Sequence, residues 1–181
     1  MKKNTLTSIS VDCLIDKKTF VDFSKFHRFH ATKTSWNLIF FPAMLLVFAI
    51  VNWIIGNNIL GWILLGISLF IPAWSLTLFY LSILKQVETF KLNTPRVFYT
   101  LTFSDKGIHI RNKKEKANYQ WTQVYKSYRT QNSIYLYFTP ANAFIIPSDS
   151  LQDYTMDDLW SFFQKNLSND KLINKNVIHE K

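Results

Sequence analysis

The sequence lacks charge over a long central stretch. No Asp, Glu, Lys, Arg or His occurs between Lys33 and Lys85, a run of 51 residues, although the chain contains 21 basic residues, 12 acidic residues and four histidines. About 20 apolar residues already span a hydrocarbon core roughly 30 Å thick, and a soluble domain of this size could not surround two such helices. A cleaved signal peptide is not expected either, because residues 1–33 are polar and the apolar run is too long. The sequence therefore predicts insertion into a membrane.

Cysteine and glycine are both scarce. The single cysteine, Cys13, excludes an intrachain disulfide and fits a reducing compartment. The chain has only four glycines, and they form no phosphate-binding loop. The charge-free run also lacks the ionisable side chains that proton relays and ion pathways use. We therefore expect this run to serve as an anchor, not as a pump or channel.

The charge-free run is long enough for two transmembrane helices. Within residues 34–84 we predict helices at 36–55 and 59–84, joined by a Gly-Asn-Asn turn at 56–58. Glycine and asparagine both favour tight chain reversals at a wet surface. Basic residues precede the first helix and follow the second, and the turn between the helices has none. The positive-inside rule therefore predicts a multi-pass protein with both termini in the cytoplasm.

Small residues recur at seven-residue spacing on both predicted helices, as expected where helices approach closely in lipid. The predicted hairpin contact consists of Ala49, Gly56, Gly61, Ser68, Ser75 and Ser82. The alternative is chance alignment, since small residues are common in membrane helices. The sequence leaves open whether copies of the chain associate.

Residues 1–33 predict a cytoplasmic strand and helix. Residues 5–15 alternate, with Ile9, Val11, Cys13 and Ile15 on one side, so this strand needs a sheet that the C-terminal part can supply. Residues 16–33 contain four phenylalanines spread over one half of a helix. That helix either lies at the lipid interface or packs on the cytoplasmic domain, and the sequence favours neither.

Residues 85–168 predict a small antiparallel β domain closed by a helix. Short alternating runs occur at 97–103, 108–111, 117–121, 134–138 and 144–147. Thr155 and Asp158 have the spacing of a capping box, and an apolar helical stripe follows it: Met156, Leu159, Trp160, Phe163 and Leu167. Residues 169–181 read as a frayed polar tail. The predicted fold class is an α+β membrane protein.

One set of residues in the C-terminal region carries a family resemblance: Phe103, Asp105, Gly107, Ile108, Trp121, Val124, Tyr135-Leu136-Tyr137, Ile146-Pro147, Phe162 and Phe163. With these residues the region resembles the bacterial YcxB-like family of membrane proteins. The resemblance covers roughly residues 5–168, and its specific part is about the last 70 of these. It implies two membrane spans and a cytoplasmic domain similar to pleckstrin-homology (PH) folds, in a bacterial cell membrane. Ser148 departs from the basic residue that the family commonly has there. The resemblance implies no catalytic residue and no cofactor.

Histidine and serine side chains are the candidates for a metal site or a hydrolase site. His27 and His30 have a spacing that suits two metal ligands, but no nearby Cys, Asp or Glu pair completes a site. Ser148, Ser150 and His109 could be combined into a hydrolase site, but no nucleophile elbow occurs. We expect no catalytic, cofactor or metal site.

A basic cluster is the surface feature that suggests binding. It consists of Lys106, Arg111, Lys113, Lys114 and Lys116. Near an anionic leaflet each basic residue contributes about 1 kcal/mol of attraction. The alternative is a solvated hairpin tip. Nucleic acid is not an expected partner, because the net charge of +9 is divided between the two flanks of the membrane segment.

Two functions follow from this sequence. The first is a non-enzymatic membrane protein whose PH-like domain binds a partner protein or anionic lipid headgroups. The second is an accessory or immunity-type subunit of a membrane transport complex, in which the small-residue stripe packs against helices of a partner.

Overall fold

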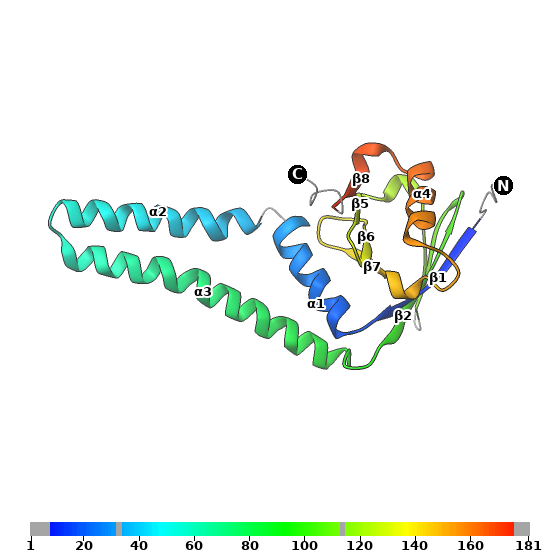
Figure 1. Cartoon of the computed structure of the whole chain (residues 1–181), viewed down its shortest axis with the longest axis horizontal. Coiled ribbons are helices and arrows are strands. Elements are labelled where there is room, and N and C mark those ends of the chain that lie inside the picture. The colour runs from blue at the N-terminus through cyan, green and yellow to red at the C-terminus, as the bar shows by residue number, and fades with distance from the viewer. Residues whose placement is uncertain (1–7, 32–33, 113–114, 176–181) are drawn as a thin grey trace. The chain divides into compact units, whose positions relative to one another are not determined.

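The chain folds into two compact units. Figure 1 shows the computed structural model, which describes residues 8–31, 34–112 and 115–175. One unit, here the β unit, combines Met1–Phe23 with Leu92–Lys181, and the other, the helical unit, is Ser24–Lys91. The predicted boundaries at residues 33 and 85 placed the N-terminal strand in a segment of its own, whereas the structure joins it to the C-terminal domain.

The first sheet of the β unit contains strands from both ends of the chain. Its order is β1 (Ser8–Ile15), β2 (Arg96–Ser104), β3 (Gly107–Arg111) and β4 (Lys116–Tyr119), and all its pairs are antiparallel. Ile9 pairs with Phe103 in β2, and both side chains are fully buried. The predicted strand at 5–15 and its need for a C-terminal sheet are thus confirmed, with residues 5–7 outside the described part.

The second sheet has the order β7 (Ala143–Pro147), β6 (Ser133–Tyr137), β5 (Lys126–Arg129) and β8 (Leu172–Asn174). β8 pairs with β5 in parallel, and the Lys175 amide extends this pairing to the carbonyl of Arg129 at 2.9 Å. The prediction of a frayed tail is therefore wrong up to this point, because the open edge of β5 supplies hydrogen-bond partners. Residues 176–181 lie outside the described part.

Helix α4 (Met156–Asn166) completes the core between the two sheets. Phe163 is fully buried, with its ring 5.1 Å from that of Phe103 and 5.7 Å from that of Trp121. The predicted capping box is confirmed, since the Asp158 amide donates to the Thr155 hydroxyl at 3.1 Å and the Thr155 amide donates to the Asp158 carboxylate at 2.9 Å. The α+β class with antiparallel strands is confirmed as well.

Two polar side chains join the sheets at their edges. The Tyr99 hydroxyl donates to the carbonyl of Ile145 at 3.0 Å and accepts from its amide at 2.7 Å, which ties β2 to β7. Burial of this phenol raises the pKa of Tyr99. The Ser150 hydroxyl accepts from the Leu14 amide at 2.9 Å, beside the irregular step between Cys13 and Leu14 in β1. Ser150 ends a 3₁₀ turn at Ser148–Ser150, so it has a structural role.

The helical unit consists mainly of two helices. Helix α1 (Lys17–Phe26) leads into it and continues as a π-helix at His27–Ala31. Helix α2 spans Thr34–Ile54, and helix α3 spans Asn58–Thr89, five residues past the predicted end. In the described part of the chain, α3 is the one helix both long and apolar enough to cross a membrane, and the apolar stretch Ile39–Ile54 of α2 is shorter. The structure thus contains both predicted helices, and one of the two, α3, is a candidate membrane span.

The buried thiol of Cys13 generates a prediction about pH. Burial, and to a lesser extent the Asp12 carboxylate, raise the pKa of Cys13 in the folded chain. The protonated thiol therefore contributes stability that is complete below the pKa of an unfolded thiol, about 8.5, and is lost above it by up to about 1.4 kcal/mol per pH unit. We expect the free energy of unfolding in detergent to fall more steeply between pH 8 and pH 9.5 for the unmodified chain than for Cys13→Val. Equal slopes would contradict the prediction.

Candidate functional site

Among the described residues of the predicted basic cluster, Lys106 lies apart from Arg111 and Lys116. Lys106 precedes β3, whereas Arg111 ends that strand and pairs with Lys116 across the hairpin. Five residues of extended chain separate Lys106 from Arg111 by about 17 Å. Lys113 and Lys114 lie outside the described residues. Of the three described members, Arg111 and Lys116 are therefore neighbours, and both are exposed.

Acidic residues accompany the basic ones at both ends of β3. Beside Lys106, the Asp105 carboxylate forms an ion pair with Lys165 of α4 at 2.9 Å, with both side chains at least half exposed. Near Arg111, Glu115 is exposed, and its amide donates to the Asn112 side chain at 2.6 Å. Each end thus presents mixed charge.

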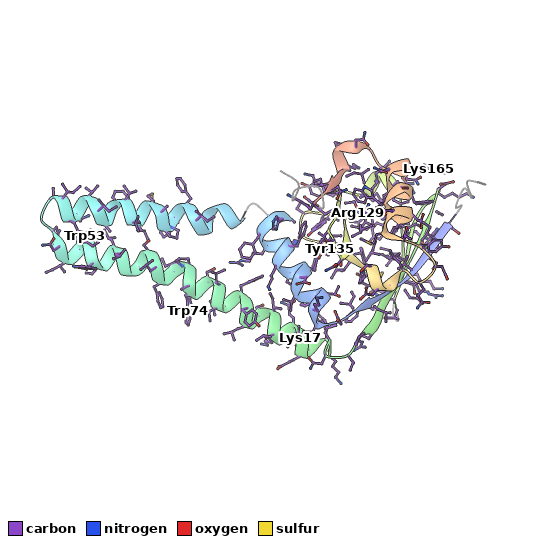
Figure 2. All side chains as sticks on the ribbon, in the orientation of Figure 1. Lys17, Trp53, Trp74, Arg129, Tyr135 and Lys165 are labelled. Atoms are coloured by element: carbon purple, nitrogen blue, oxygen red, sulfur yellow. The ribbon has the colours of Figure 1, made fainter. Side chains whose placement is uncertain are left out.

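The predicted small-residue contact forms in the part of the hairpin nearest the turn. Ala49 is fully buried, and Ser68 is 3% exposed. The Ser68 hydroxyl donates to the Pro42 carbonyl of α2 at 2.9 Å. Gly61 lies under the indole of Trp53, where an added Cβ would collide with the ring. Figure 2 shows Trp53 beside the turn.

The remaining three residues of the stripe have other surroundings. Gly56 forms the turn with φ +83° and is exposed. The Ser75 hydroxyl accepts from Arg28 Nη2 at 3.0 Å, and the exposed Ser82 accepts from Gln86 one turn further along α3. The seven-residue spacing predicted Gly56 in line with Ala49 on the first helix and predicted Ser75 and Ser82 on one face of the second, but the structure puts all three outside the close helix contact.

The described histidines, His27, His30 and His109, do not lie in a group with nucleophiles or metal ligands. His109 pairs with Asn118 on an exposed face of the first sheet, whereas Ser150 is bonded to the backbone of β1. His27 and His30 lie in the π-helix. Within the residues that the structure describes, no group of three or more His, Cys, Asp or Glu could hold a metal ion.

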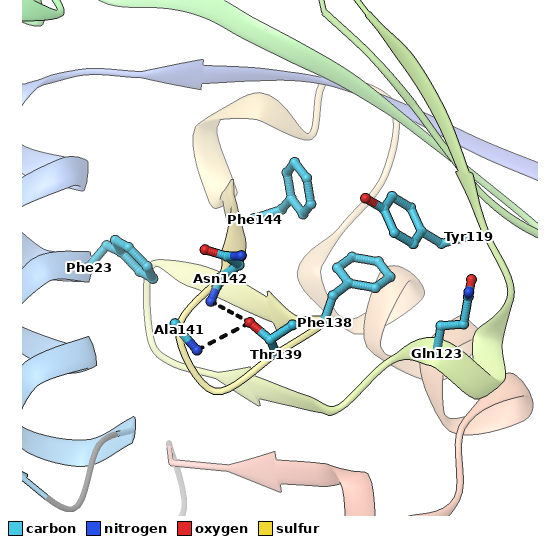
Figure 3. A pocket seen from close by; sticks show the side chains of 9 residues that line it. Phe23, Tyr119, Gln123, Phe138, Thr139, Ala141, Asn142 and Phe144 are labelled. Atoms are coloured by element: carbon cyan, nitrogen blue, oxygen red, sulfur yellow. Dashed lines mark hydrogen bonds between the residues drawn. The ribbon is translucent and has the colours of Figure 1, made fainter.

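A pocket that the sequence did not predict lies at the end of β6 and β7 in the β unit. Its volume is about 570 Å³. Figure 3 shows its lining, which comes from α1, β4, a 3₁₀ turn at Trp121–Gln123 and the β6–β7 turn. We call it the aromatic pocket and define it by Phe23, Tyr119, Gln123, Phe138, Thr139, Ala141, Asn142, Ala143 and Phe144.

Aromatic rings form a connected series along the aromatic pocket. The rings of Tyr119 and Phe138 lie 4.3 Å apart, and Phe144 meets Phe138 edge to face at 5.7 Å. Phe144 in turn contacts Tyr99 at 5.0 Å, which links the series to the hydrogen bonds between β2 and β7. On the other side, Phe23 of α1 packs edge to face on Tyr135 at 5.2 Å. The rings are thus held by both sheets and by α1.

Polar groups form the rim of the aromatic pocket. The Thr139 hydroxyl accepts from the amides of Ala141 and Asn142 at 3.3 and 3.0 Å, which fixes the β6–β7 turn (Figure 3). The Gln123 side chain accepts from the Gln120 amide at 2.8 Å. Rigid aromatic walls with amides at the rim are suited to hold an apolar side chain and to meet peptide hydrogen-bonding groups.

Sequence reasoning missed this pocket because its walls come from distant segments. Phe23 was read only as part of a phenylalanine-rich helix, and Phe138 and Phe144 only as strand residues. The available signal was the density of aromatic residues, 17% of the chain, but it does not say which rings converge.

The comparison with known families decides how this part of the chain is classified. Residues 103–159 match the family model described as YcxB-like protein. The predicted resemblance is thereby confirmed over this segment. The YcxB-like segment runs from the end of β2 into α4 and includes every residue of the aromatic pocket except Phe23. No curated protein and no solved structure matched the chain.

The Gly61 contact generates a prediction about the hairpin. Gly61→Val places a branched side chain against the Trp53 indole, whereas a Cβ added at Gly66 meets no neighbouring atom within 4 Å. Overpacking of this kind costs typically about 1–3 kcal/mol. We expect Gly61→Val to lower the thermal unfolding temperature of the detergent-purified chain and Gly66→Val to leave it within error. Equal behaviour of the two variants would show that α2 and α3 do not pack at Gly61.

Proposed function

We propose that the chain is a membrane-anchored, non-enzymatic binding protein. The hairpin of α2 and α3 crosses the bilayer twice, and the β unit is a PH-like domain on the cytoplasmic side. This domain binds a partner protein by taking an apolar side chain of a peptide segment into the aromatic pocket. The observation that carries the proposal is that the apolar pair of helices lies, in the sequence, between two segments that fold together as the β unit.

Membrane insertion is supported by the outward faces of α2 and α3. Large apolar side chains are exposed along both helices, among them Ile39, Phe40, Val47, Phe48, Ile54, Ile59, Trp62, Ile63, Leu69, Phe70, Trp74 and Leu81. An exposed apolar surface of this extent is unfavourable in water and is covered by acyl chains in a bilayer. At about 1.5 Å per residue, the 21 residues of α2 reach about 31 Å, enough for a second span beside α3.

Orientation is supported by the charged flanks. Lys25 and Arg28 precede α2, Lys85 and Lys91 lie at the end of α3, and the turn at 56–58 is uncharged. The positive-inside rule then places both termini in the cytoplasm. The proposed location in a bacterial cell membrane is what the resemblance to the YcxB-like family implies.

The PH-like assignment is supported by the arrangement of the β unit. Two four-stranded sheets enclose one apolar core, and α4 after β7 buries Leu159 and Phe163 in it. Folds of this kind serve many functions, so the binding role is argued from the pocket. Its aromatic and amide lining offers contact area and hydrogen bonds to a peptide.

The accessory-subunit alternative receives less support. In that version the small residues of the hairpin would pack against a partner's helices. Ala49, Gly61 and Ser68 are instead buried within the hairpin. A partner's helices would have to contact the large outward side chains.

Topology can be tested with cysteines at two exposed positions in a Cys13→Ala background. Asn58→Cys at the start of α3 should react with a membrane-impermeant maleimide on intact cells. Gln164→Cys on α4 should react only after the membrane is permeabilised. Labelling of both positions on intact cells, or of neither, would contradict the proposed topology.

Partner binding can be tested by site-specific photocrosslinking in native membranes. A photoreactive phenylalanine analogue at Asn142, on the rim of the aromatic pocket, should give a discrete crosslinked protein, and the same analogue at Gln164 should not. Ala143→Trp adds an indole to the pocket lining and should reduce the Asn142 crosslink about tenfold, whereas Ser161→Trp, at an exposed position of α4 outside the lining, should not. A crosslink that both tryptophan variants leave intact would place the partner elsewhere.

A further inference from the structure

A groove on the helical unit lies beside Arg28. It is lined by Arg28 and by one face of α3 that includes Phe70, Ile71, Trp74, Ser75 and Leu78, and its volume is about 440 Å³. Phe70 and Trp74 stack with ring centres 5.8 Å apart, and both are more than half exposed. Figure 2 shows Trp74 on α3. The groove therefore combines an apolar floor with one cationic side chain.

Arg28 is held in place by two contacts with α3. Its Nη2 donates to the Ser75 hydroxyl at 3.0 Å, and its guanidinium carbon lies 4.6 Å from the centre of the Phe79 ring. Stacking on an aromatic ring fixes the plane of a guanidinium group, which is also the geometry that recognises phosphate. The Ser75 hydroxyl accepts from Arg28, so its own proton is available to donate to an anion in the groove.

The position of Arg28 along α3 fits the inner edge of a bilayer. At about 1.5 Å per residue, Ser75 lies about 26 Å along the helix from Asn58 at the turn. The hydrocarbon core of a bilayer is about 30 Å thick. The guanidinium group is therefore near the level at which the phosphates of the cytoplasmic leaflet begin, and Phe70 and Trp74 lie on the acyl-chain side of it.

The net positive charge of the helical unit favours binding of an anion. Residues 24–91 contain Lys25, Arg28, Lys33, Lys85 and Lys91 but one acidic residue, Glu88. Basic residues at the cytoplasmic surface attract anionic lipid within about a Debye length.

We propose that this groove binds one anionic glycerophospholipid of the cytoplasmic leaflet. The phosphate accepts hydrogen bonds from Arg28 and Ser75, and an acyl chain lies along Phe70 and Trp74. The inference rests on the proposed membrane insertion of the hairpin. It assigns a lipid site to the helical unit, separate from the aromatic pocket and from the basic residues of the β3–β4 hairpin.

Trp74 provides the readout, because a bromine on an acyl chain quenches indole fluorescence at close range. The full chain is reconstituted in phosphatidylcholine vesicles that contain either brominated phosphatidylglycerol or brominated phosphatidylcholine. The Trp74 signal is the difference between the unmodified chain and Trp74→Phe. We expect phosphatidylglycerol to be preferred at Trp74 by about five-fold, the size expected for one basic residue at the surface.

Three variants test whether the preference for phosphatidylglycerol depends on the groove. Arg28→Gln should lower the ratio of Trp74 quenching by the two lipids to about one, and Ser75→Ala should lower this ratio about two-fold. Lys85→Gln, which removes an exposed charge further along α3, should leave it unchanged. Circular dichroism of each variant checks that the helices are retained.

Other outcomes would overturn the lipid site. Equal quenching of Trp74 by the two brominated lipids would do so, as would a preference that survives in Arg28→Gln. Loss of the preference on addition of inorganic phosphate alone would assign Arg28 to a free anion instead. Absence of quenching at any tryptophan by either lipid would contradict membrane insertion itself, which separates failure of the anchor from failure of the site.

Discussion

The pairing of β1 with β2 is the constraint on which the other features of this chain depend. Ile15 and Arg96 are partners in one antiparallel ladder, although the entire helical unit lies between them in the sequence. The Lys17 amide donates to the Leu92 carbonyl at 2.8 Å, so the chain leaves and re-enters the β unit at adjoining points. Closing so long a loop has an entropic cost that rises only slowly with length, and the buried face of β1 offsets it.

This pairing also sets an order of events. The core contains Ile9, Val11 and Cys13 from β1, and each of them is at most 2% exposed. None of these contacts can form before β2 has emerged from the ribosome, and both helices of the hairpin emerge before it. The hairpin is therefore free to enter a membrane while the β unit lacks its partner strand. Once β2 is available, Tyr99 and Ser150 attach the second sheet to the strands on either side of the inserted segment.

Local patterns predicted the regular elements well and the chemistry of the surface poorly. The alternation in β1 and the capping box of α4 are local properties, and both were read correctly. Strand β5 was missed because Lys126–Arg129 has no apolar alternation: Ser127 is fully buried, and Arg129 instead forms an ion pair with Asp157 at 2.8 Å. β8 was missed because its pairing depends on a strand more than 40 residues away. The basic cluster and the aromatic pocket depend on which strand ends meet, which spacing in sequence does not encode.

The segment from α1 through the π-helix supplies one residue to each candidate site. The sequence left open whether this segment packs on the cytoplasmic domain or lies at the lipid interface. Phe23 packs on Tyr135 of the β unit, so the first part of the segment packs on the domain, whereas Arg28 contacts Ser75 and Phe79 of the helical unit. A place at the lipid interface stays a prediction for the residues after Phe23. The change from α-helix to π-helix at His27 lies between these residues and alters the direction in which successive side chains point. In the π-helix, Arg28 lines the groove on α3, and the ring of the neighbouring Phe29 lies 6.2 Å from that of Phe79.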